Sequence, residues 1–362
     1  MTWFKDLIGY ESPKKTQQIG SLLDAQPDKN QITMIGTRGA GKSSHIAGLI
    51  KAADRKVSTS RDTDNPFRYI IDEGSSNIIH DVSALRAGNF PPPTGASKRS
   101  YMEPGVTFEW TSVKRIGGQT ITLSRKQARM PILDLAGEDL VKLIDKVKQA
   151  RSLGDLSSVE ADNAERITNK VNQSSGLMLI IKATRAQGLG FEIEKEPCDI
   201  NGMSIYSDAN LARMVNGIIR YKRQHPESPP LRHVAIVITA WDGLAPVAKK
   251  ISQITGVEFN PLDEKISNES LDKFVYAFFP STHAAITSLG ISNIRYFPSY
   301  FLVERDGHGN PLCWEGTTNH KIKRVDLFDS ARQWQDNANT IYDSEKWFFK
   351  ELDWLQEFAT LG

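Results

Sequence analysis

The stretch Gln31-Ile-Thr-Met-Ile-Gly-Thr-Arg-Gly-Ala-Gly-Lys-Ser-Ser-His-Ile46 decides the fold of this chain. A short apolar run (Ile32, Met34, Ile35) comes first, and eight residues with the spacing G-x-x-x-x-G-K-S follow it. An apolar pattern with helical spacing begins directly after these eight residues. This order predicts a strand, a glycine-rich loop and a helix.

The residue types in the loop are those that phosphate binding requires. Glycines let the backbone curl so that successive N–H groups converge on phosphate oxygens, and the helix N-terminus adds its partial positive charge. We expect Lys42 to reach the β- and γ-phosphates of a nucleotide and the Ser43 hydroxyl to ligate Mg²⁺. The nucleotide-binding residues predicted in this stretch are Gly36, Thr37, Arg38, Gly39, Ala40, Gly41, Lys42, Ser43 and Ser44.

Length and composition are those of an ordinary globular protein. The 362 residues suffice for one large α/β domain or two smaller ones. With 45 basic and 43 acidic residues, the net charge of +2 does not indicate a nucleic-acid partner or an anionic membrane. Cys198 and Cys313 match neither a metal site nor a disulfide framework, and the longest apolar run, 177–181, is too short for a membrane span. We therefore expect a cytoplasmic protein without a signal peptide.

A second phosphate-site pattern follows the loop in the chain. The apolar run Met130–Leu135 delivers Asp134 at its end, and Gly137 and Glu138 come directly afterwards. In a phosphate site, such an Asp holds Mg²⁺, usually through a water, and the Gly offers its N–H to a γ-phosphate. Asp134 is therefore a candidate metal ligand and Gly137 a candidate nucleotide contact.

The alternation of strands and helices predicts an α/β fold, namely a P-loop NTPase with three α/β/α layers, a mostly parallel central sheet and helical insertions. Alternating residues on either side of Gly117-Gly118 predict a β-hairpin, and the polar stretch 53–67 predicts a loop. The apolar face of residues 1–10 suits packing on the domain, docking to a partner or a weak interfacial anchor. The predicted division is an N-terminal helical segment, 1–29; a P-loop domain, 30–328, with insertions at 53–104, 139–175 and 185–206; and a C-terminal helix packed on the domain, 329–362.

Over roughly residues 30–305, these motifs resemble a P-loop GTPase of the class that includes Ras-like and translation-factor GTPases. The resemblance implies Mg²⁺ with GTP or GDP, and it adds a third motif, Thr239-Ala-Trp-Asp242, where the family has Asn/Thr-Lys-x-Asp. It implies that Asp242 hydrogen-bonds the guanine edge. Ala240 replaces a lysine that would lie across the base and the phosphate loop, so the choice between GTP and ATP stays open. Trp241 is a candidate to stack on the base instead, and Ser299 is matched to a further base-flanking turn.

The run Pro91-Pro-Pro-Thr94, together with Asp134–Glu138, is similar to bacterial double-GTPase proteins of multi-gene conflict or phage-defence systems. The similarity implies that Thr94 completes Mg²⁺ coordination, with Thr107 as the alternative. Glu138 occupies the position of the water-orienting Gln of Ras-like proteins. Because its charge would oppose the transition state, we expect slow hydrolysis that a protein partner or self-association raises. The catalytic residues predicted are Lys42, Glu138 and Thr94, and the candidates for an arginine finger in cis are Arg38, Arg61, Arg68, Arg86 and Arg99.

The leading hypothesis is a nucleotide-dependent switch that binds and slowly hydrolyses GTP, as a regulatory subunit of a bacterial multi-gene system. Two other functions stay open, an ATP-dependent motor or assembly ATPase and a nucleotide-bound scaffold with little hydrolysis. Oligomerisation that depends on GTP and not on ATP would favour the switch over the motor.

Overall fold

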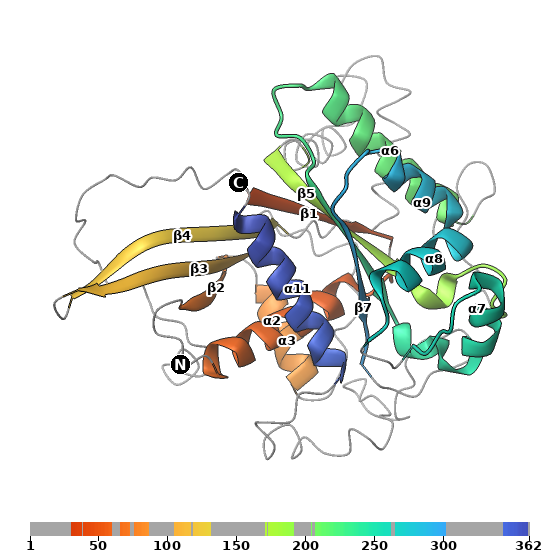
Figure 1. The fold of residues 1–362 in the computed structure, drawn as a ribbon, viewed down its shortest axis with the longest axis horizontal. Coiled ribbons are helices and arrows are strands. Elements are labelled where there is room, and N and C mark those ends of the chain that lie inside the picture. The colour runs from red at the N-terminus through yellow and green to blue at the C-terminus, as the bar shows by residue number, and fades with distance from the viewer. Residues whose placement is uncertain are drawn as a thin grey trace.

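A computed structural model gives the fold of the chain (Figure 1). The structure describes residues 30–37, 39–59, 66–72, 76–86, 105–116, 119–131, 171, 173–191, 204, 207–261, 265–301 and 343–360. The predicted N-terminal segment, 1–29, lies outside these residues.

In the described part of the chain, seven strands form one mixed, mostly parallel sheet in the order β2-β3-β4-β1-β5-β6-β7. The pairs from β4 through β1, β5 and β6 to β7 are parallel, and β2 and β3 add an antiparallel edge. The strands are β1 (Gln31–Gly36), β2 (Phe67–Ile71), β3 (Gly105–Ile116), β4 (Gln119–Pro131), β5 (Ser174–Lys182), β6 (His233–Thr239) and β7 (Ile294–Ser299). The predicted α/β class and mostly parallel sheet are confirmed.

The two strands β5 and β6 are apolar almost throughout because both of their faces are covered. Every residue of β6 is buried, and so is every residue of β5 except Lys182, which is half-buried. A strand with one face in solvent would alternate apolar and polar residues, whereas a parallel strand between two layers of helices carries a continuous apolar run. This explains why 177–181 was the longest apolar run in the sequence.

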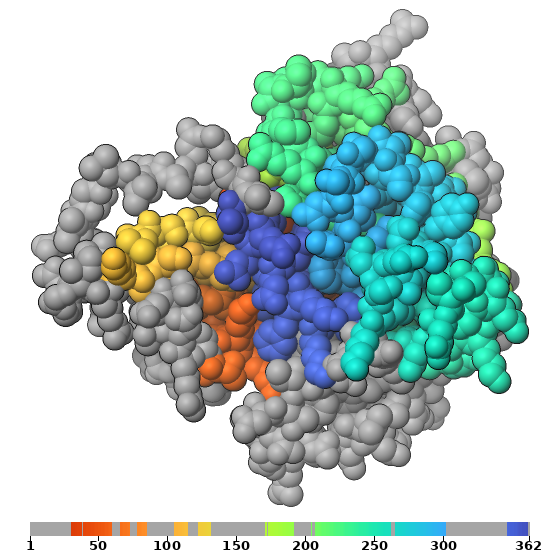
Figure 2. Space-filling model, viewed as in Figure 1, coloured from red at the N-terminus to blue at the C-terminus, as the bar shows by residue number. Residues whose placement is uncertain are grey.

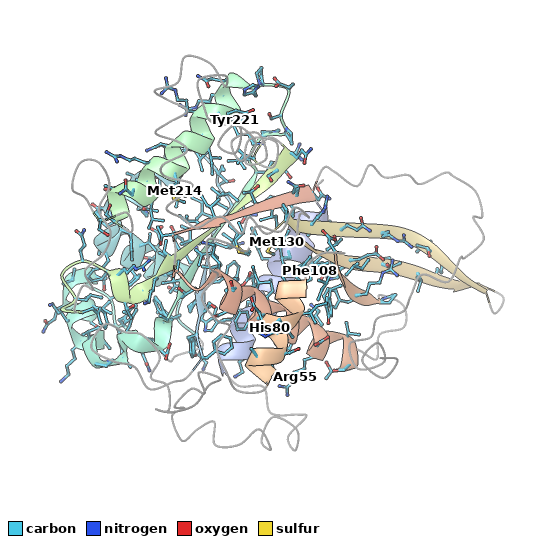
Figure 3. The ribbon with its side chains drawn as sticks, turned by 180° about the vertical axis from the view of Figure 1, so that it is seen from behind. Arg55, His80, Phe108, Met130, Met214 and Tyr221 are labelled. Carbon is cyan, nitrogen blue, oxygen red and sulfur yellow. The ribbon has the colours of Figure 1, made fainter. Side chains whose placement is uncertain are left out.

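Helices pack on both faces of the sheet, and each face has its own apolar cluster. On one face Met34 of β1 lies in a cluster with residues of α2, α3 and α11, among them Phe348. On the other face Ile35, the next residue of β1, lies in a cluster with Met214 of α6 and residues of α8 and α9. Figure 3 labels members of both clusters. The helices are α2 (Lys42–Thr59), α3 (Ser76–Arg86), α6 (Asp208–Gln224), α7 (Ala248–Thr255), α8 (Asn268–Phe278), α9 (Pro280–Thr287) and α11 (Asp343–Thr360).

The strand β1 stands where the direction of winding changes. After β1 the chain packs α2 on one face and continues to β2, β3 and β4 on one side of β1. After β5 it packs α6 on the other face and continues to β6 and β7 on the other side. In open α/β sheets, ligands bind outside the carboxyl ends of the strands at such a switch point. The loop after Gly36 lies there.

The predicted β-hairpin is confirmed and is longer than the sequence indicated. Strands β3 and β4 pair antiparallel from Gly105 opposite Pro131 to Ile116 opposite Gln119, and their distal part projects from the body (Figure 1). The first two residues of the apolar run, Met130 and Pro131, belong to β4, and the rest of the run lies outside the described residues. The strand β4 therefore pairs antiparallel with β3 in the hairpin and parallel with β1 on its other side.

One sequence expectation about the helices needs correction. The stretch 53–67 is predicted as a loop, but α2 continues to Thr59 because Ala53 is fully buried against the apolar cluster and Asp54 hydrogen-bonds Tyr69. The helices α8 and α9 are separate, since Pro280 begins α9. The α6 helix begins with the Ser207 side chain accepting a hydrogen bond from the Asn210 N–H.

The helix α11 packs against the core, and residues 329–342 of the predicted C-terminal helix lie outside the described residues. It contacts α2, β4 and β7, and Figure 2 shows it on the viewed face beside α2. Four of its aromatic or leucine side chains, Phe348, Leu352, Leu355 and Phe358, are at most 2% exposed. No helix in the described residues is both long enough and apolar enough to cross a bilayer.

A buried hydrogen-bond chain joins α11 to the helix after the glycine-rich loop. His45 of α2 lies with Nε2 3.0 Å from Glu351 Oε1 of α11 and with Nδ1 2.9 Å from Ser299 Oγ of β7. All three side chains are nearly inaccessible to solvent. Because each imidazole nitrogen has its own partner, the histidine is satisfied in the core, and it fixes three elements to one another.

We expect Glu351→Ala to lower the free energy of unfolding by about 2–3 kcal/mol, because it leaves a buried ring nitrogen of His45 without its partner. Glu351→Gln, which keeps the shape and a hydrogen-bonding group, should cost less. The matched control is Asp353→Ala on the same helix. Its carboxylate pairs with Lys56 but is 65% exposed, so the change should stay within about 0.5 kcal/mol. Urea unfolding measures both, and equal effects would contradict the prediction.

Candidate functional site

The carboxyl ends of the parallel strands bring the described candidate residues to one edge of the sheet. Gly36 pairs with Ile180 of β5, and Thr239 of β6 pairs with Lys182 on one side and with Ser299 of β7 on the other. The residues that follow these strand ends therefore share the edge with the glycine-rich loop. They are the loop itself, the short 3-10 helix η3 (Ala183–Arg185) and the 3-10 helix η4 (Trp241–Val247).

The glycines of the loop are at positions that other residues fill poorly. Gly39 has φ of 67° and Gly41 has φ of 87°, in the left-handed region that a Cβ disfavours. A tight turn closes where the Ala40 N–H donates to Thr37 O, and the first helical bond of α2 follows from His45 N–H to Gly41 O. The loop thus curls directly into a helix N-terminus, whose unpaired N–H groups carry partial positive charge.

Lys42 folds back over the loop that precedes it. Its ammonium donates to Gly36 O at 2.8 Å and to Thr37 O at 3.2 Å. These bonds hold a positive charge at the mouth of the loop, next to the helix N-terminus. Lys42 and the hydroxyl-bearing residues Ser43 and Ser44 are half-buried, in the first turn of α2. The arrangement suits an anion, because a fixed cation and a helix N-terminus face the same place.

The hydroxyl of Thr239 ties the loop to the sheet. Its Oγ1 hydrogen-bonds Ala40 O in the loop and lies 3.0 Å from Ile181 O of β5. A Cβ added to Gly41 would stand 3.4 Å from the Thr239 side chain, so the loop and the end of β6 are in contact. The threonine predicted from the third motif thus contacts the backbone of the glycine-rich loop.

The next residue, Ala240, turns the chain sharply into η4. Its φ of 55° makes it the one non-glycine residue with positive φ among the described residues. Such a conformation costs a residue with a Cβ about 1–2 kcal/mol, and outliers of this kind gather at functional sites. Asp242 follows in the first turn of η4 and is 8% exposed.

The proposed stacking role of Trp241 is contradicted. The indole is fully buried, and its ring centroid lies 5.1 Å from those of both Phe259 and Phe274. It belongs to the apolar cluster on the α6 side of the sheet. The sequence placed an aromatic residue beside the base motif, but burial of its large apolar surface in the core decides its position.

Ser299 lies at the same edge as Thr239, at the end of β7, but its hydroxyl bonds His45 of α2. That contact links β7 to the helix after the loop. Its predicted place in a base-flanking turn stays a prediction.

Several predicted site residues lie outside the described part of the chain. They are Arg38, Thr94, Asp134, Gly137 and Glu138, together with the arginine-finger candidates Arg61 and Arg99. Of the predicted Mg²⁺ ligands, only Ser43 is described. Among the described residues, no group of three or more His, Cys, Asp or Glu side chains is placed to hold a metal ion.

Two alternatives raised from the sequence are remote from the loop. Thr107 of β3 pairs with Arg129 of β4, which in turn pairs with Gln31 at the start of β1. The loop begins five residues later on β1, about 16 Å away along a strand. Thr107 therefore cannot share a metal ion with Ser43. Arg68 lies on the edge strand β2, where it pairs with the buried Glu109 at 2.6 Å.

Sequence reasoning missed one residue at this edge. Arg185 ends η3, and its Nη1 donates to Thr37 Oγ1 at 3.0 Å. Its Nη2 would stand 3.3 Å from a Cβ on Gly39. The available signal was that Arg185 comes three residues after an apolar parallel strand that neighbours β1. The carboxyl ends of such strands meet at one edge of the sheet, so a residue at this place lies near the glycine-rich loop.

The lysine with a lowered pKa lies at the opposite edge of the sheet. Burial lowers the pKa of Lys222 to about 8, and its ammonium donates to Ser174 O at 2.6 Å and to Pro229 O at 2.8 Å. Ser174 is the first residue of β5, so Lys222 joins α6 to the amino ends of the strands. This perturbed group is therefore structural.

No family model matches this sequence, and no curated protein matches it. The chemistry of the site must therefore be inferred from its own residues.

We expect Thr239→Val to lower the free energy of unfolding by about 1–2 kcal/mol, because it keeps the shape but removes the hydroxyl that bonds Ala40 O. The control is Thr287→Val on α9, whose exposed hydroxyl bonds only carbonyls of its own helix among the bonds described. Its cost should be within about 0.5 kcal/mol. Thermal or urea unfolding without nucleotide compares the two variants. A Thr239→Val chain as stable as Thr287→Val would mean that the loop does not depend on this bond.

Proposed function

We propose that this chain is a P-loop protein that binds a nucleoside triphosphate with Mg²⁺ and acts as a slowly hydrolysing GTP-dependent switch. One observation carries the proposal. Lys42 donates to Gly36 O and Thr37 O across a loop whose two later glycines have positive φ. This is the form that a G-x-x-x-x-G-K-S loop takes when its lysine and backbone N–H groups are to meet phosphates.

The location of the loop supports the same proposal. It lies at the carboxyl end of a central strand, at the switch point of a mostly parallel sheet, and it leads into the N-terminus of an 18-residue helix. Substrate phosphates in α/β proteins bind at such places, where the helix dipole and unpaired N–H groups favour negative charge. Ser43, at the second position of the helix, is the proposed Mg²⁺ ligand from the described residues.

The proposal that the base is guanine rests on Asp242. A carboxylate accepts hydrogen bonds only, and the guanine edge offers two N–H donors, whereas the adenine edge offers a mixed pattern. Asp242 follows Thr239, whose hydroxyl contacts the loop, so the base motif and the phosphate motif are neighbours.

In the proposed switch, the γ-phosphate orders the segments that carry Thr94 and Gly137, and a protein partner or a second copy of the chain reads the change. Glu138 makes unassisted hydrolysis slow, because its charge opposes charge development on the γ-phosphate. A regulatory place in a bacterial multi-gene system is part of this proposal and rests on the sequence resemblance alone.

ATP is the second candidate nucleotide, and two observations favour keeping it. Ala240 supplies no long side chain to lie across a base, and Trp241 is buried in the core rather than available for stacking. Base selection thus depends on Asp242 more heavily than in the family that the motifs resemble. An ATP-driven assembly subunit and a nucleotide-bound scaffold would both use the same loop.

Calorimetric titration of GTP, GDP and ATP with Mg²⁺ tests the proposal. We expect the wild-type chain to bind GTP and GDP, and Lys42→Ala to weaken GTP binding about a hundredfold, because charge-assisted hydrogen bonds to the phosphates are lost. The control is Lys114→Ala, an exposed lysine on β3 far from the loop, which should bind like the wild type.

Each other result has a distinct meaning. ATP binding equal to or tighter than GTP binding would replace the GTPase with the ATP-driven alternative. Binding of no nucleotide by the wild type would overturn the proposed function. Nucleotide binding without hydrolysis, even with a partner present, would favour the nucleotide-bound scaffold over both other functions.

Asp242→Ala tests base recognition separately. We expect GTP binding to weaken about tenfold or more and ATP binding to change little. The reason is that the proposed hydrogen bonds of this carboxylate are to the N–H donors of guanine. Asp353→Ala, an exposed aspartate of α11, is the control. A parallel loss for both nucleotides would mean that Asp242 acts on the fold of η4 and does not read the base.

A further inference from the structure

The guanidinium of Arg185 lies against the glycine-rich loop. Its Nη1 donates to Thr37 Oγ1 at 3.0 Å, and its Nη2 stands 3.3 Å from the place that a Cβ on Gly39 would take. Thr37 is buried and Gly39 is exposed, so the guanidinium spans the loop from its anchored start to its accessible turn. One side chain from η3 thus bonds Thr37 and lies beside Gly39.

The backbone around Arg185 is fixed. Ala183 is fully buried and Ala186 is 5% exposed, and the Ala186 N–H closes the short turn by donating to Ala183 O. The turn begins directly after β5, whose Ile180 pairs with Gly36 at the end of β1. The distance from Arg185 to the loop is therefore set by the sheet itself, and a long arginine side chain is sufficient to reach across.

A cation at this place acts in two ways. Its planar fork of donors holds the Thr37 hydroxyl, and Thr37 O accepts from Lys42, so the two cations are fixed on one residue. Its charge also raises the potential where an anion would lie, and a half-buried charge is screened less than an exposed one. The motif position Ala240, which directly precedes the neighbouring 3-10 helix η4, contributes no such charge.

We propose that Arg185 is a positioning residue of the nucleotide site, which holds Thr37 beside Gly39 in the arrangement that binds phosphate and adds a second positive charge beside the polyphosphate. This inference rests on the proposed function, since it concerns the same loop. The ligand feature that it recognises is the di- or triphosphate, whichever base is attached.

Titration of Mg·GTP, Mg·GDP and GMP into Arg185→Ala, Arg185→Lys and Thr37→Val tests the inference. We expect Arg185→Ala to weaken GTP and GDP about tenfold, with a smaller effect on GMP, because fewer phosphate charges remain to be attracted. Arg185→Lys keeps the charge without the fork and should recover part of this affinity. Arg223→Ala, an exposed arginine near the end of α6, is the matched control and should bind like the wild type.

Combining substitutions at Thr37 and Arg185 gives a measurement that a change in overall stability alone does not affect, namely the non-additivity of their effects on nucleotide affinity. If the guanidinium acts on the loop through the threonine, Thr37→Val and Arg185→Ala will be non-additive, and the double variant will bind about as weakly as Arg185→Ala alone. Should Arg185→Ala not fold, as judged by circular dichroism, Arg185→Lys and Thr37→Val answer the same question.

Three outcomes would overturn the inference. The first is nucleotide binding by Arg185→Ala within twofold of the wild type while Lys42→Ala loses it, which leaves the proposed function intact. The second is additive loss in the double variant, which would mean that Arg185 does not act through Thr37. The third is a wild-type chain that binds no nucleotide, which overturns the proposed function and this inference together.

Discussion

The close approach of Gly36 to β5 is the constraint on which the candidate site depends. A Cβ at this position would stand 2.7 Å from Ile180 O, closer than a side-chain carbon can lie to a backbone oxygen. Only glycine lets β1 run against β5 at the point where the chain leaves the sheet for the loop. Because β1 and β5 are neighbours in the centre of the sheet, this contact sets where the loop begins relative to every strand end around it.

From that starting point, the loop is held by two neighbouring strands rather than by its own turns alone. Thr239 at the end of β6 bonds the loop carbonyl of Ala40, and Arg185 after β5 bonds the side chain of Thr37. The lysine of the loop closes over the same segment. A loop fixed in this way loses little conformational freedom when an anion arrives, and that is the physical advantage of pre-organisation.

Features that depend on local chemistry could be predicted from the sequence, and features that depend on distant partners could not. Adjacent residues determine the strand, loop and helix around Gly36–Ser43, and they also determine the cap at Ser207. Each of these features matches the structure. By contrast, the sequence predicts a loop at the polar end of α2, because the partners that hold it in the helix are remote. Asp54 bonds Tyr69, and Lys56 bonds Asp353 of α11.

The same limit explains what sequence reasoning could not find at the site. His45 bonds Glu351, 306 positions away, and no spacing in the sequence reveals that pairing. Arg185 follows an apolar strand and forms no motif, so it becomes a site residue only once β5 is known to pair with β1. The segment that carries Asp134 and Glu138 lies outside the described residues, so this part of the prediction stays a prediction.

In the proposed function, the described edge offers unequal means of holding a phosphate and a base. Toward phosphates it offers a helix N-terminus, Lys42 and Arg185, whereas toward a base the third motif offers Asp242 on a short 3-10 helix that begins after a strained alanine. A left-handed alanine persists only where the surrounding packing holds it, and the adjacent Trp241, whose indole packs against Phe259 and Phe274, supplies such packing. The tryptophan thus holds the backbone that carries Asp242, and it does so from within the core. In the proposed function, base selection by Asp242 therefore depends on the packing of the core.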